Sequence, residues 1–183
     1  MYQMNLRSPY PYWLLRHGII NSYPSLDADV KTEIVIMGAG ISGTLVANQL
    51  CQAGYQVVIV DRRHAGMGST AASTSLLQYE IDKPLHQLIN IAGEKKAVRS
   101  YLLCRQAILD IKKICDRLKN TGLFSQKPSF QFASFKKDVT DLKNEYSLRK
   151  KAGFSLHWLN EKDIHKNHIC CGSVALGHYH AFL

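Results

Sequence analysis

Residues 33–61 begin with Glu-Ile-Val-Ile-Met-Gly-Ala-Gly-Ile-Ser-Gly and close with Tyr-Gln-Val-Val-Ile-Val-Asp. The apolar run Ile34–Met37 has the length and the branched side chains of a buried parallel strand. A helical pattern continues as far as Gly54, and Val57–Val60 forms a second apolar run. This order of strand, glycine-rich turn, helix and strand predicts a Rossmann-like βαβ unit and places the chain in the α/β class.

Three glycines in the turn meet the physical requirements of a bound pyrophosphate. Gly38 permits a tight turn after the strand, Gly40 lets the backbone approach a phosphate, and Gly43 lets the helix lie close to the strand. The amides that open the helix have no intrahelical acceptor and carry the positive end of the helix dipole. The predicted phosphate site is therefore Gly38, Ala39, Gly40, Ile41, Ser42 and Gly43.

An acidic residue, Asp61, closes the second strand, 21 residues after Gly40. A carboxylate there can accept hydrogen bonds from ribose hydroxyls, and its charge would repel a 2′-phosphate. The glycines alone would be weak evidence, but the two strands and this acid agree with them. The apolar stripe expected on the helix includes Leu45, Val46 and Leu50. We interpret the unit as dinucleotide-binding rather than as an ordinary βαβ turn without a ligand.

A run of small and basic residues follows the acid: Arg62-Arg63-His64-Ala65-Gly66-Met67-Gly68-Ser69-Thr70. With this run, the chain resembles FAD-dependent oxidoreductases of the D-amino-acid oxidase type, which include enzymes that oxidise glycine, sarcosine and glycerol phosphate. In that family an acid-plus-basic pair ends the second strand, and a Gly-x-Gly-Ser/Thr segment folds back along the FAD pyrophosphate. Asp61-Arg62 and Gly66–Thr70 match these elements. The resemblance implies FAD as the cofactor, with contacts from Asp61, Arg62, Gly68, Ser69, Thr70 and Ser73.

The residues of this run also allow a second interpretation. Hydroxyl side chains that can donate to phosphate oxygens are present at Ser69, Thr70, Ser73 and Thr74. Alternatively, Ser69 or Thr70 caps a helix that begins near Ala71 in a solvated loop. Arg62 could lie against the adenine or the phosphates, whereas Arg63 is expected to be an exposed loop charge.

The length of the chain, 183 residues, is enough for one good core or for one and a fraction domains. Members of the family that it resembles are about twice as long, and their flavin domain takes later strands from the C-terminal half. The match extends to about residue 165. We therefore expect a truncated member, with an N-terminal extension (1–30), an FAD-binding βαβ unit (31–82), a helical segment (83–126) and a partial substrate domain with an atypical tail (127–183).

Apolar periodicity predicts the elements that follow the nucleotide-binding unit. They are a short helix from Pro84 to Ile91, a long helix over Glu94–Asn120, a strand over Ser129–Ser134, a helix over Lys137–Ala152, a strand over Phe154–Leu159 and a turn capped by Asn160. We expect the apolar stripe of the long helix to pack on its own domain, with a coiled-coil surface as the alternative. If the second half of the fold is absent, part of this stripe is exposed and favours self-association.

The formal net charge of +9 invites a nucleic-acid hypothesis. Residues 94–151 contain fifteen Lys or Arg and six Asp or Glu, so the excess lies on two helices. These charges lack interleaved aromatic residues, a helix-turn-helix pattern and zinc-finger spacing. We interpret them as solvated helix faces and predict no nucleic-acid partner, with a basic interaction protein as an alternative function.

The C-terminal tail is rich in possible zinc ligands: His157, His165, His168, Cys170, Cys171, His178 and His180. Structural zinc sites usually place Cys or His pairs at short fixed spacings on hairpin or helix turns, and neither Cys170-Cys171 nor His178-x-His180 has such a spacing. We predict no metal. The five scattered cysteines indicate reduced thiols.

No apolar run approaches the roughly 18 residues of a membrane helix, and the N-terminus lacks the apolar core of a signal peptide, so a cytoplasmic protein without a membrane span is predicted. By resemblance, the function is oxidation of an amine, amino acid or hydroxy compound by hydride transfer to flavin. A small-molecule substrate is expected in a complete enzyme, together with self-association or a completing chain. The alternative is a dinucleotide-binding fragment without catalysis. No catalytic residue is identified.

Overall fold

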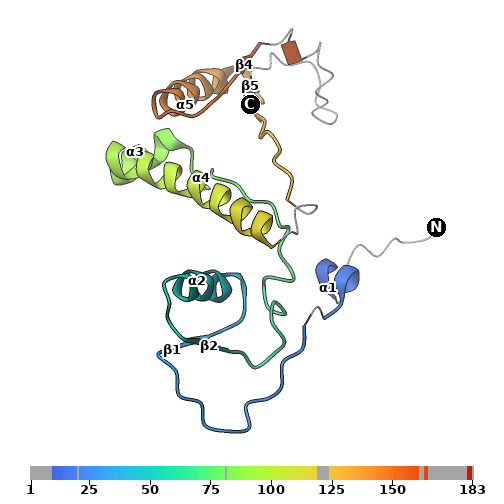
Figure 1. Cartoon of the computed structure of the whole chain (residues 1–183). Helices are drawn as coiled ribbons and strands as arrows, with labels where there is room; N and C mark the ends of the chain where they lie inside the picture. Colours follow the sequence, from blue (N-terminus) through green and yellow to red (C-terminus); the bar gives the residue numbers. More distant parts are fainter. Residues whose placement is uncertain are drawn as a thin grey trace, which may run out of the picture. The chain divides into compact units, whose positions relative to one another are not determined.

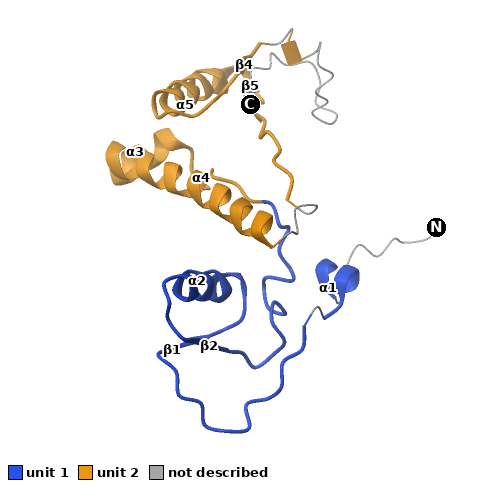
Figure 2. Ribbon diagram, viewed as in Figure 1, with its two compact units in different colours: residues 1–76 blue, residues 77–183 orange. Residues whose placement is uncertain are grey.

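The computed structural model describes residues 10–19, 21–80, 82–118, 124–160, 163–164 and 181–182. The chain forms two compact units, residues 1–76 and residues 77–183 (Figure 2). The elements of the first unit are α1 (Tyr12–His17), β1 (Ile34–Met37), α2 (Ile41–Gln52) and β2 (Val57–Val60) (Figure 1). Those of the second are α3 (Leu85–Ala92), α4 (Glu94–Arg117), β3 (Gln131–Phe132), the 3-10 turn η2 (Lys136–Asp138), α5 (Val139–Lys151), β4 (Trp158–Leu159) and β5 (Ala181–Phe182).

The first unit contains the predicted βαβ arrangement. β1 and β2 run parallel, with Ile34 opposite Val57 and Met37 opposite Val60, and α2 connects them. Both strands have the predicted bounds, because each is a run of four apolar residues between turn residues. Gly54 follows the helix with φ +92°, a backbone conformation in which glycine is favoured.

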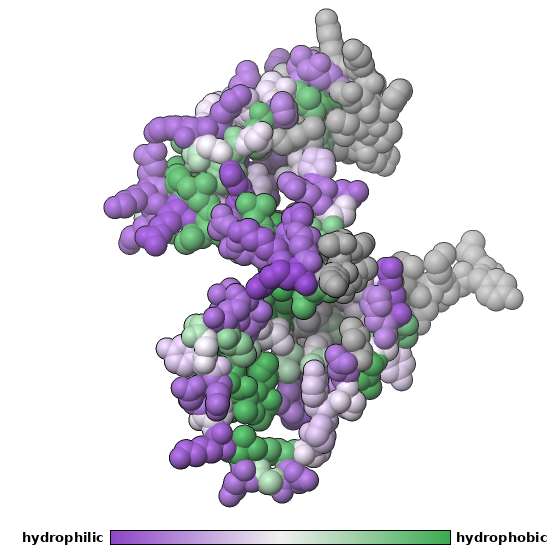
Figure 3. Space-filling view, in the orientation of Figure 1, coloured by the Kyte–Doolittle hydropathy of each residue, from purple (hydrophilic) through white to green (hydrophobic). Residues whose placement is uncertain are grey.

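The two faces of β1 differ in exposure. Ile36 lies on the side of α2, whereas Val35 and Met37 are 58% and 89% exposed. The predicted stripe of α2 is wrong at Val46, which is 52% exposed, because the helical rotation that buries Ala47 turns its neighbour outward. Figure 3 accordingly shows hydrophobic side chains at the surface of the first unit.

The second unit has a core built around Tyr101 of α4. Tyr101 is fully buried and its ring contacts Tyr79 and Phe154 edge-on. The other members of the core are Leu85, Ala97, Ala133, Leu142 and Leu156. The α4 stripe thus packs on its own unit over the first turns, as predicted. Farther along, Cys104, Ile108, Ile111 and Cys115 are only half-buried and Leu118 is 71% exposed.

The strands of the second unit are shorter than predicted. The strand predicted over Phe154–Leu159 pairs only at β4, because Phe154 and Leu156 pack in the core. The strand predicted over Ser129–Ser134 pairs only at β3. β5 lies between β3 and β4 and is antiparallel to both. This central strand comes from the tail, where the sequence predicts no element.

Helix boundaries in this unit are closer to expectation. The predicted helix over Lys137–Ala152 is α5, preceded by η2. Asn160 caps the following turn as predicted, because its Oδ1 accepts a hydrogen bond from the amide of Asp163 at 3.1 Å. Among the described residues, no helix combines the length and apolar character needed to cross a membrane.

Candidate cofactor site

The turn between β1 and α2 is tightly built. Gly38 has φ +107°, and its amide donates to the carbonyl oxygen of Val60 at 2.8 Å. A Cβ atom on Gly43 would overlap the carbonyl oxygen of Gly38 and lie 3.3 Å from Cγ2 of Ile36. The third glycine is therefore needed for the close approach of α2 to β1, as predicted.

The amino end of α2 meets a second segment of the chain. The amide of Ile41 donates to Oγ1 of Thr70 at 3.0 Å, and a Cβ on Gly40 would lie 3.2 Å from the same oxygen. This amide is one of the four that an α-helix leaves without an intrahelical acceptor. Because the Thr70 oxygen accepts this bond, its own proton is available to donate elsewhere.

Asp61 joins the turn to the segment after β2. Its Oδ2 accepts the amide hydrogen of Ala39 at 2.8 Å, and its Oδ1 accepts that of Arg63 at 2.8 Å. The hydrogen bond from Ala39 lowers the pKa of Asp61 most. The bond from Arg63 and the charges of Arg63 and Arg62 lower this pKa further, against a smaller effect of desolvation. The side chain is exposed, so its remaining lone pairs are open to a ligand hydroxyl.

The segment after Asp61 folds back onto the turn, as the resemblance implies. The amide of Gly66 donates to the carbonyl oxygen of Ala39 at 2.9 Å. A series of turns follows, in which Ala71, Ala72 and Ser73 each donate to the carbonyl three residues earlier. The helix suggested near Ala71 does not form, so Ser69 and Thr70 are not helix caps here.

The structure thus brings together part of the predicted site. Ala39, Ile41, Asp61 and Thr70 are linked directly by the hydrogen bonds above, and Gly40 lies against Thr70. The side chains of Ser42 and Ser69 are exposed. Gly68 is covered by another basic residue, Arg63, whose Nη2 would lie 3.0 Å from a Cβ added there.

Arg63 is an exposed loop residue, as expected from the sequence. Sequence reasoning missed one residue near this site, Trp13. Trp13 donates from Nε1 to the carbonyl oxygen of Ser73 at 2.7 Å. Nothing in the local sequence pattern indicates a contact over this separation.

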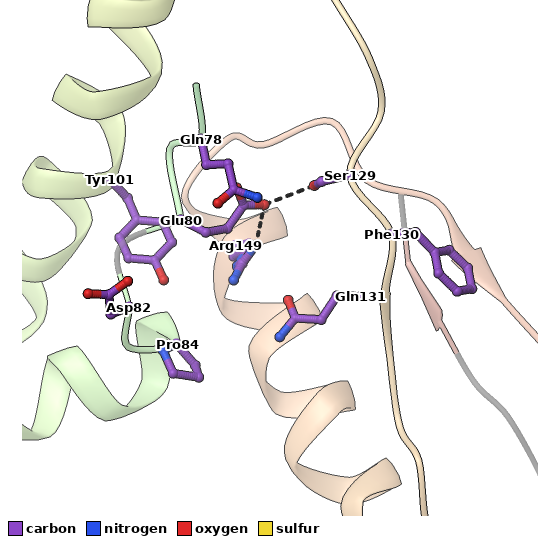
Figure 4. Close-up of a pocket in the computed structure, with 9 residues that line it drawn as sticks. All are labelled: Gln78, Glu80, Asp82, Pro84, Tyr101, Ser129, Phe130, Gln131 and Arg149. Atoms are coloured by element: carbon purple, nitrogen blue, oxygen red, sulfur yellow. Dashed lines mark hydrogen bonds and ion pairs between the residues drawn. The ribbon is translucent and has the colours of Figure 1, made fainter. Parts of the chain in front are cut away.

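A separate hollow of about 330 Å³ lies in the second unit (Figure 4). Its residues are Gln78, Glu80, Asp82, Pro84, Tyr101, Ser129, Phe130, Gln131 and Arg149. Figure 4 shows the carboxylate of Glu80 between Ser129, which donates at 2.9 Å, and Arg149, which donates from Nη1 at 3.2 Å. Burial raises the pKa of Tyr101 to about 12, so its phenol stays protonated and donates to the carbonyl of Lys83.

The charges behind this hollow are buried and paired. Arg149 donates from Nε to Oε1 of Glu145 at 2.7 Å, and the two residues are 2% and 1% exposed. Glu145 also accepts the amides of Leu85 and His86 at 2.7 and 2.9 Å, which begin α3. Burial acts to raise the pKa of Glu145. The two amide hydrogen bonds, a hydrogen bond with the His86 side chain and the charge of Arg149 together outweigh burial, so the pKa is lowered. The pair therefore has a structural task in holding α3 on α5.

Comparison with known proteins identifies the family. Residues 33–179 match a family model described as FAD dependent oxidoreductase. The chain belongs to this family of FAD-dependent oxidoreductases. The family resemblance and the fold class predicted from the sequence are thereby confirmed, although the match continues to residue 179 and not only to about residue 165 as expected. FAD is the cofactor on which the family depends.

Longer proteins that are similar to this chain agree with the family match. A Bacillus subtilis protein described as a putative Rieske 2Fe-2S iron-sulfur protein, YhfW, is 24% identical over 160 residues, which is 87% of this chain and 30% of that protein. An L-proline dehydrogenase from P. horikoshii superposes with a TM-score of 0.61 at 17% identity, over 85% of this chain and 37% of that one. A glycine oxidase from Bacillus cereus ATCC 14579 superposes with a TM-score of 0.58 at 17% identity, over 83% and 38%. The chain thus spans about a third of the length of these relatives.

The residues at the turn between β1 and α2 fit the diphosphate of FAD. The N-terminal amides of α2, the hydroxyl of Thr70 and the guanidinium of Arg63 are donors of the kind that phosphate oxygens accept. The carboxylate of Asp61, which directly follows β2, accepts the amide hydrogen of Ala39 and lies where the fingerprint places a ribose.

The zinc hypothesis falls largely on residues that the structure does not describe, namely His165, His168, Cys170, Cys171, His178 and His180. Among the described residues, no group of three or more His, Cys, Asp or Glu could hold a metal ion. Cys51, Cys104 and Cys115 are free thiols.

Proposed function

We propose that this chain binds the ADP half of FAD at the turn between β1 and α2 and forms part of an oxidoreductase that acts on an amine, an amino acid or a hydroxy compound. The observation that carries the proposal is the convergence of three segments. Ile41 bonds Thr70 at 3.0 Å, and Ala39 bonds Asp61 at 2.8 Å, at one end of α2. The residues proposed to contact FAD are Gly38, Ala39, Gly40, Ile41, Ser42, Gly43, Asp61, Arg62, Gly68, Ser69, Thr70 and Ser73.

Each group has a separate task in this proposal. The amides at the start of α2 and the hydroxyls of Ser69 and Thr70 donate to the diphosphate, and Arg62 and Arg63 offset its charge. Asp61 accepts hydrogen bonds from the ribose. When bound, FAD supplies the redox chemistry of this family, in which a C–H bond beside an amine or a hydroxyl gives up a hydride.

We further propose that a polypeptide covers the open face of β1. Val35 and Met37 are 58% and 89% exposed, whereas parallel sheets are normally covered on both faces. This chain covers only 37% and 38% of the two solved enzymes, so most of their length has no counterpart here. The occupant is therefore the remaining part of the family fold, in a longer product or as a separate chain, and it would also supply the groups that hold the small-molecule substrate. A second copy of this chain is the alternative occupant.

A dinucleotide-binding fragment without catalysis is the second candidate function. It is favoured by the match to only 37% and 38% of the two solved enzymes. In that case FAD would bind and no substrate would reduce it. Anaerobic addition of amines, amino acids and 2-hydroxy acids, monitored by loss of the flavin absorbance, distinguishes the two.

The binding proposal is tested by the visible absorption spectrum of the purified chain after addition of FAD and desalting. We expect the wild type to retain a two-banded flavin spectrum and Gly40→Val to lose it, because a branched side chain would displace Thr70 from the amino end of α2. Ala107→Val, on an exposed position of α4, is the matched control and should retain FAD. A colourless wild-type protein would contradict the proposal.

A further inference from the structure

A short helix that lies outside the family match contacts the cofactor loop. The match begins at residue 33, whereas α1 covers Tyr12–His17. The helix starts after Pro11, whose carbonyl oxygen accepts the amide hydrogens of Leu14 and Leu15, and ends at Gly18 with φ +63°. It belongs to the same compact unit as β1, α2 and β2.

Trp13 makes the contact through its indole nitrogen. Nε1 donates to the carbonyl oxygen of Ser73 at 2.7 Å, across 60 residues of sequence. The indole is half-buried and is held by its neighbours, since the His17 ring stacks parallel to it at 6.0 Å and the Tyr12 ring meets it edge-on at 4.9 Å. These two ring contacts thus hold the Nε1–H group of Trp13 in its orientation toward the loop.

The loop that receives this bond leads directly to the amino end of α2. The amide of Ser73 donates to the carbonyl oxygen of Thr70 at 3.3 Å, and Oγ1 of Thr70 accepts the amide hydrogen of Ile41 at 3.0 Å. Three hydrogen bonds therefore connect the indole of Trp13 to the first amide of α2.

The same loop carries a conformation that needs support. Ser75 has φ +58°, in the left-handed region that residues other than glycine rarely adopt. Its amide donates to Oγ of Ser73 at 3.1 Å, which closes a small turn at this point. Such conformations persist where surrounding contacts hold them in place. Here Trp13 supplies a contact from outside the loop.

We propose that Trp13 is a positioning residue for the FAD-binding loop and that α1 acts as a strap over it. By holding the Ser73 carbonyl, Trp13 keeps the Thr70 hydroxyl at the diphosphate, so loss of the indole N–H lets the loop move and FAD leave. This inference rests on the proposed FAD site and adds an element that the family match does not contain.

The test compares Trp13→Phe with Trp158→Phe in the full chain loaded with FAD. The phenylalanine at position 13 keeps an aromatic ring against Tyr12 and His17 but has no N–H donor. Flavin release is followed by the rise in flavin fluorescence after dilution, and folding by the urea midpoint from circular dichroism. We expect Trp13→Phe to release FAD about five- to tenfold faster than the wild type, as loss of one well-formed hydrogen bond gives. Trp158→Phe should release FAD at the wild-type rate.

A second variant, which lacks residues 1–18, removes the same hydrogen bond without placing a new side chain at position 13. It should release FAD at least as fast as Trp13→Phe. Unchanged release from either variant would overturn the positioning role. A urea midpoint for the first unit that falls in proportion to the faster release would also overturn it, because Trp13 would then be only a structural residue. A wild-type chain that retains no FAD would instead contradict the proposed function on which this inference rests.

Discussion

Each of the two units contains a carboxylate that accepts two backbone amides, but the two carboxylates lie in opposite environments. Asp61 accepts the amides of Ala39 and Arg63, both at 2.8 Å, and its side chain is exposed. Glu145 accepts the amides of Leu85 and His86 at 2.7 and 2.9 Å, and is 1% exposed. Similar backbone bonding thus occurs once at the surface and once in the core.

The difference shows how burial decides the use of a carboxylate. Glu145 must also be neutralised, which Arg149 does at 2.7 Å, so its oxygens are fully engaged within the fold. Asp61 keeps lone pairs that face solvent, so it can organise the turn and still accept hydrogen bonds from a ligand. The amides lower the pKa of both residues.

Arg149→Met tests the buried carboxylate, that of Glu145. The change removes the charge that compensates Glu145 while keeping much of the side-chain volume, and we expect a loss of about 3–5 kcal/mol in the free energy of unfolding. Urea denaturation followed by circular dichroism measures it. Lys143→Met, at an exposed position of α5, should cost less than about 0.5 kcal/mol. Similar losses in the two variants would show that the buried pair is not needed.

Gly43→Ala tests the turn that the exposed carboxylate of Asp61 holds, because the substitution forces α2 away from β1. The added methyl group would overlap the carbonyl oxygen of Gly38, and we expect a destabilisation of the first unit of about 1–3 kcal/mol, with loss of FAD retention. Desalting after addition of FAD and the near-ultraviolet circular dichroism report the two effects. Gln49→Ala, exposed on the same helix, serves as the control. Full FAD retention by Gly43→Ala would mean that FAD binding tolerates a larger separation between α2 and β1.

Asp61→Asn separates the two tasks of the exposed carboxylate. The amide keeps one oxygen to accept from a backbone amide but loses the second acceptor and the charge, so we expect FAD affinity to fall about fivefold. Titration of the flavin fluorescence measures the affinity. Asp110→Asn, at a half-exposed position of α4, should leave the affinity for FAD unchanged.

The pH dependence of FAD binding sharpens the same point. Because the pKa of Asp61 is lowered below 3.8 in the folded chain, its hydrogen bonds are fully present above that value and are lost as the pH falls through the lower folded pKa. Retention of FAD by the wild type should therefore be constant from about pH 7 to about pH 5 and fail only in more acidic solution. A midpoint of release near neutrality would assign the binding to a different group.

The smallest effect is expected for Tyr101→Phe. The ring stays in the core with Phe154, and the hydrogen bond to the carbonyl of Lys83 at 2.7 Å is lost. We expect a decrease of about 1 kcal/mol in the free energy of unfolding, measured by urea denaturation. A loss as large as that of Arg149→Met would place the phenol within the buried charge network instead.

Features that depend on nearby residues were predictable from the sequence. The bounds of β1 and β2, the glycine turn and the fold-back of the segment after Asp61 all lie within one βαβ unit. The pairing of Thr70 with the amino end of α2 agrees with the site predicted there, although contact with FAD stays a prediction.

The features that were missed depend on residues far apart in the chain. Trp13 meets Ser73 across 60 residues, Arg149 meets Glu80 across 69, and β5 inserts between two strands that precede it by more than twenty residues. Periodicity reports which face of an element is apolar, and it does not report which distant segment covers that face. The shortening of β3 and β4 has the same origin. Ala133, Phe154 and Leu156 lie in stretches that local propensity assigned to strands, but they pack in the core instead.

The exposure of Met37 has a chemical consequence. A thioether that is 89% exposed is open to peroxide and forms the sulfoxide readily, whereas one covered by a packed helix is protected. The oxidation of this single residue, followed by mass spectrometry, therefore records whether the open face of β1 is free or covered in a given preparation. The sulfoxide is polar, so oxidation would also weaken the face for any later apolar partner.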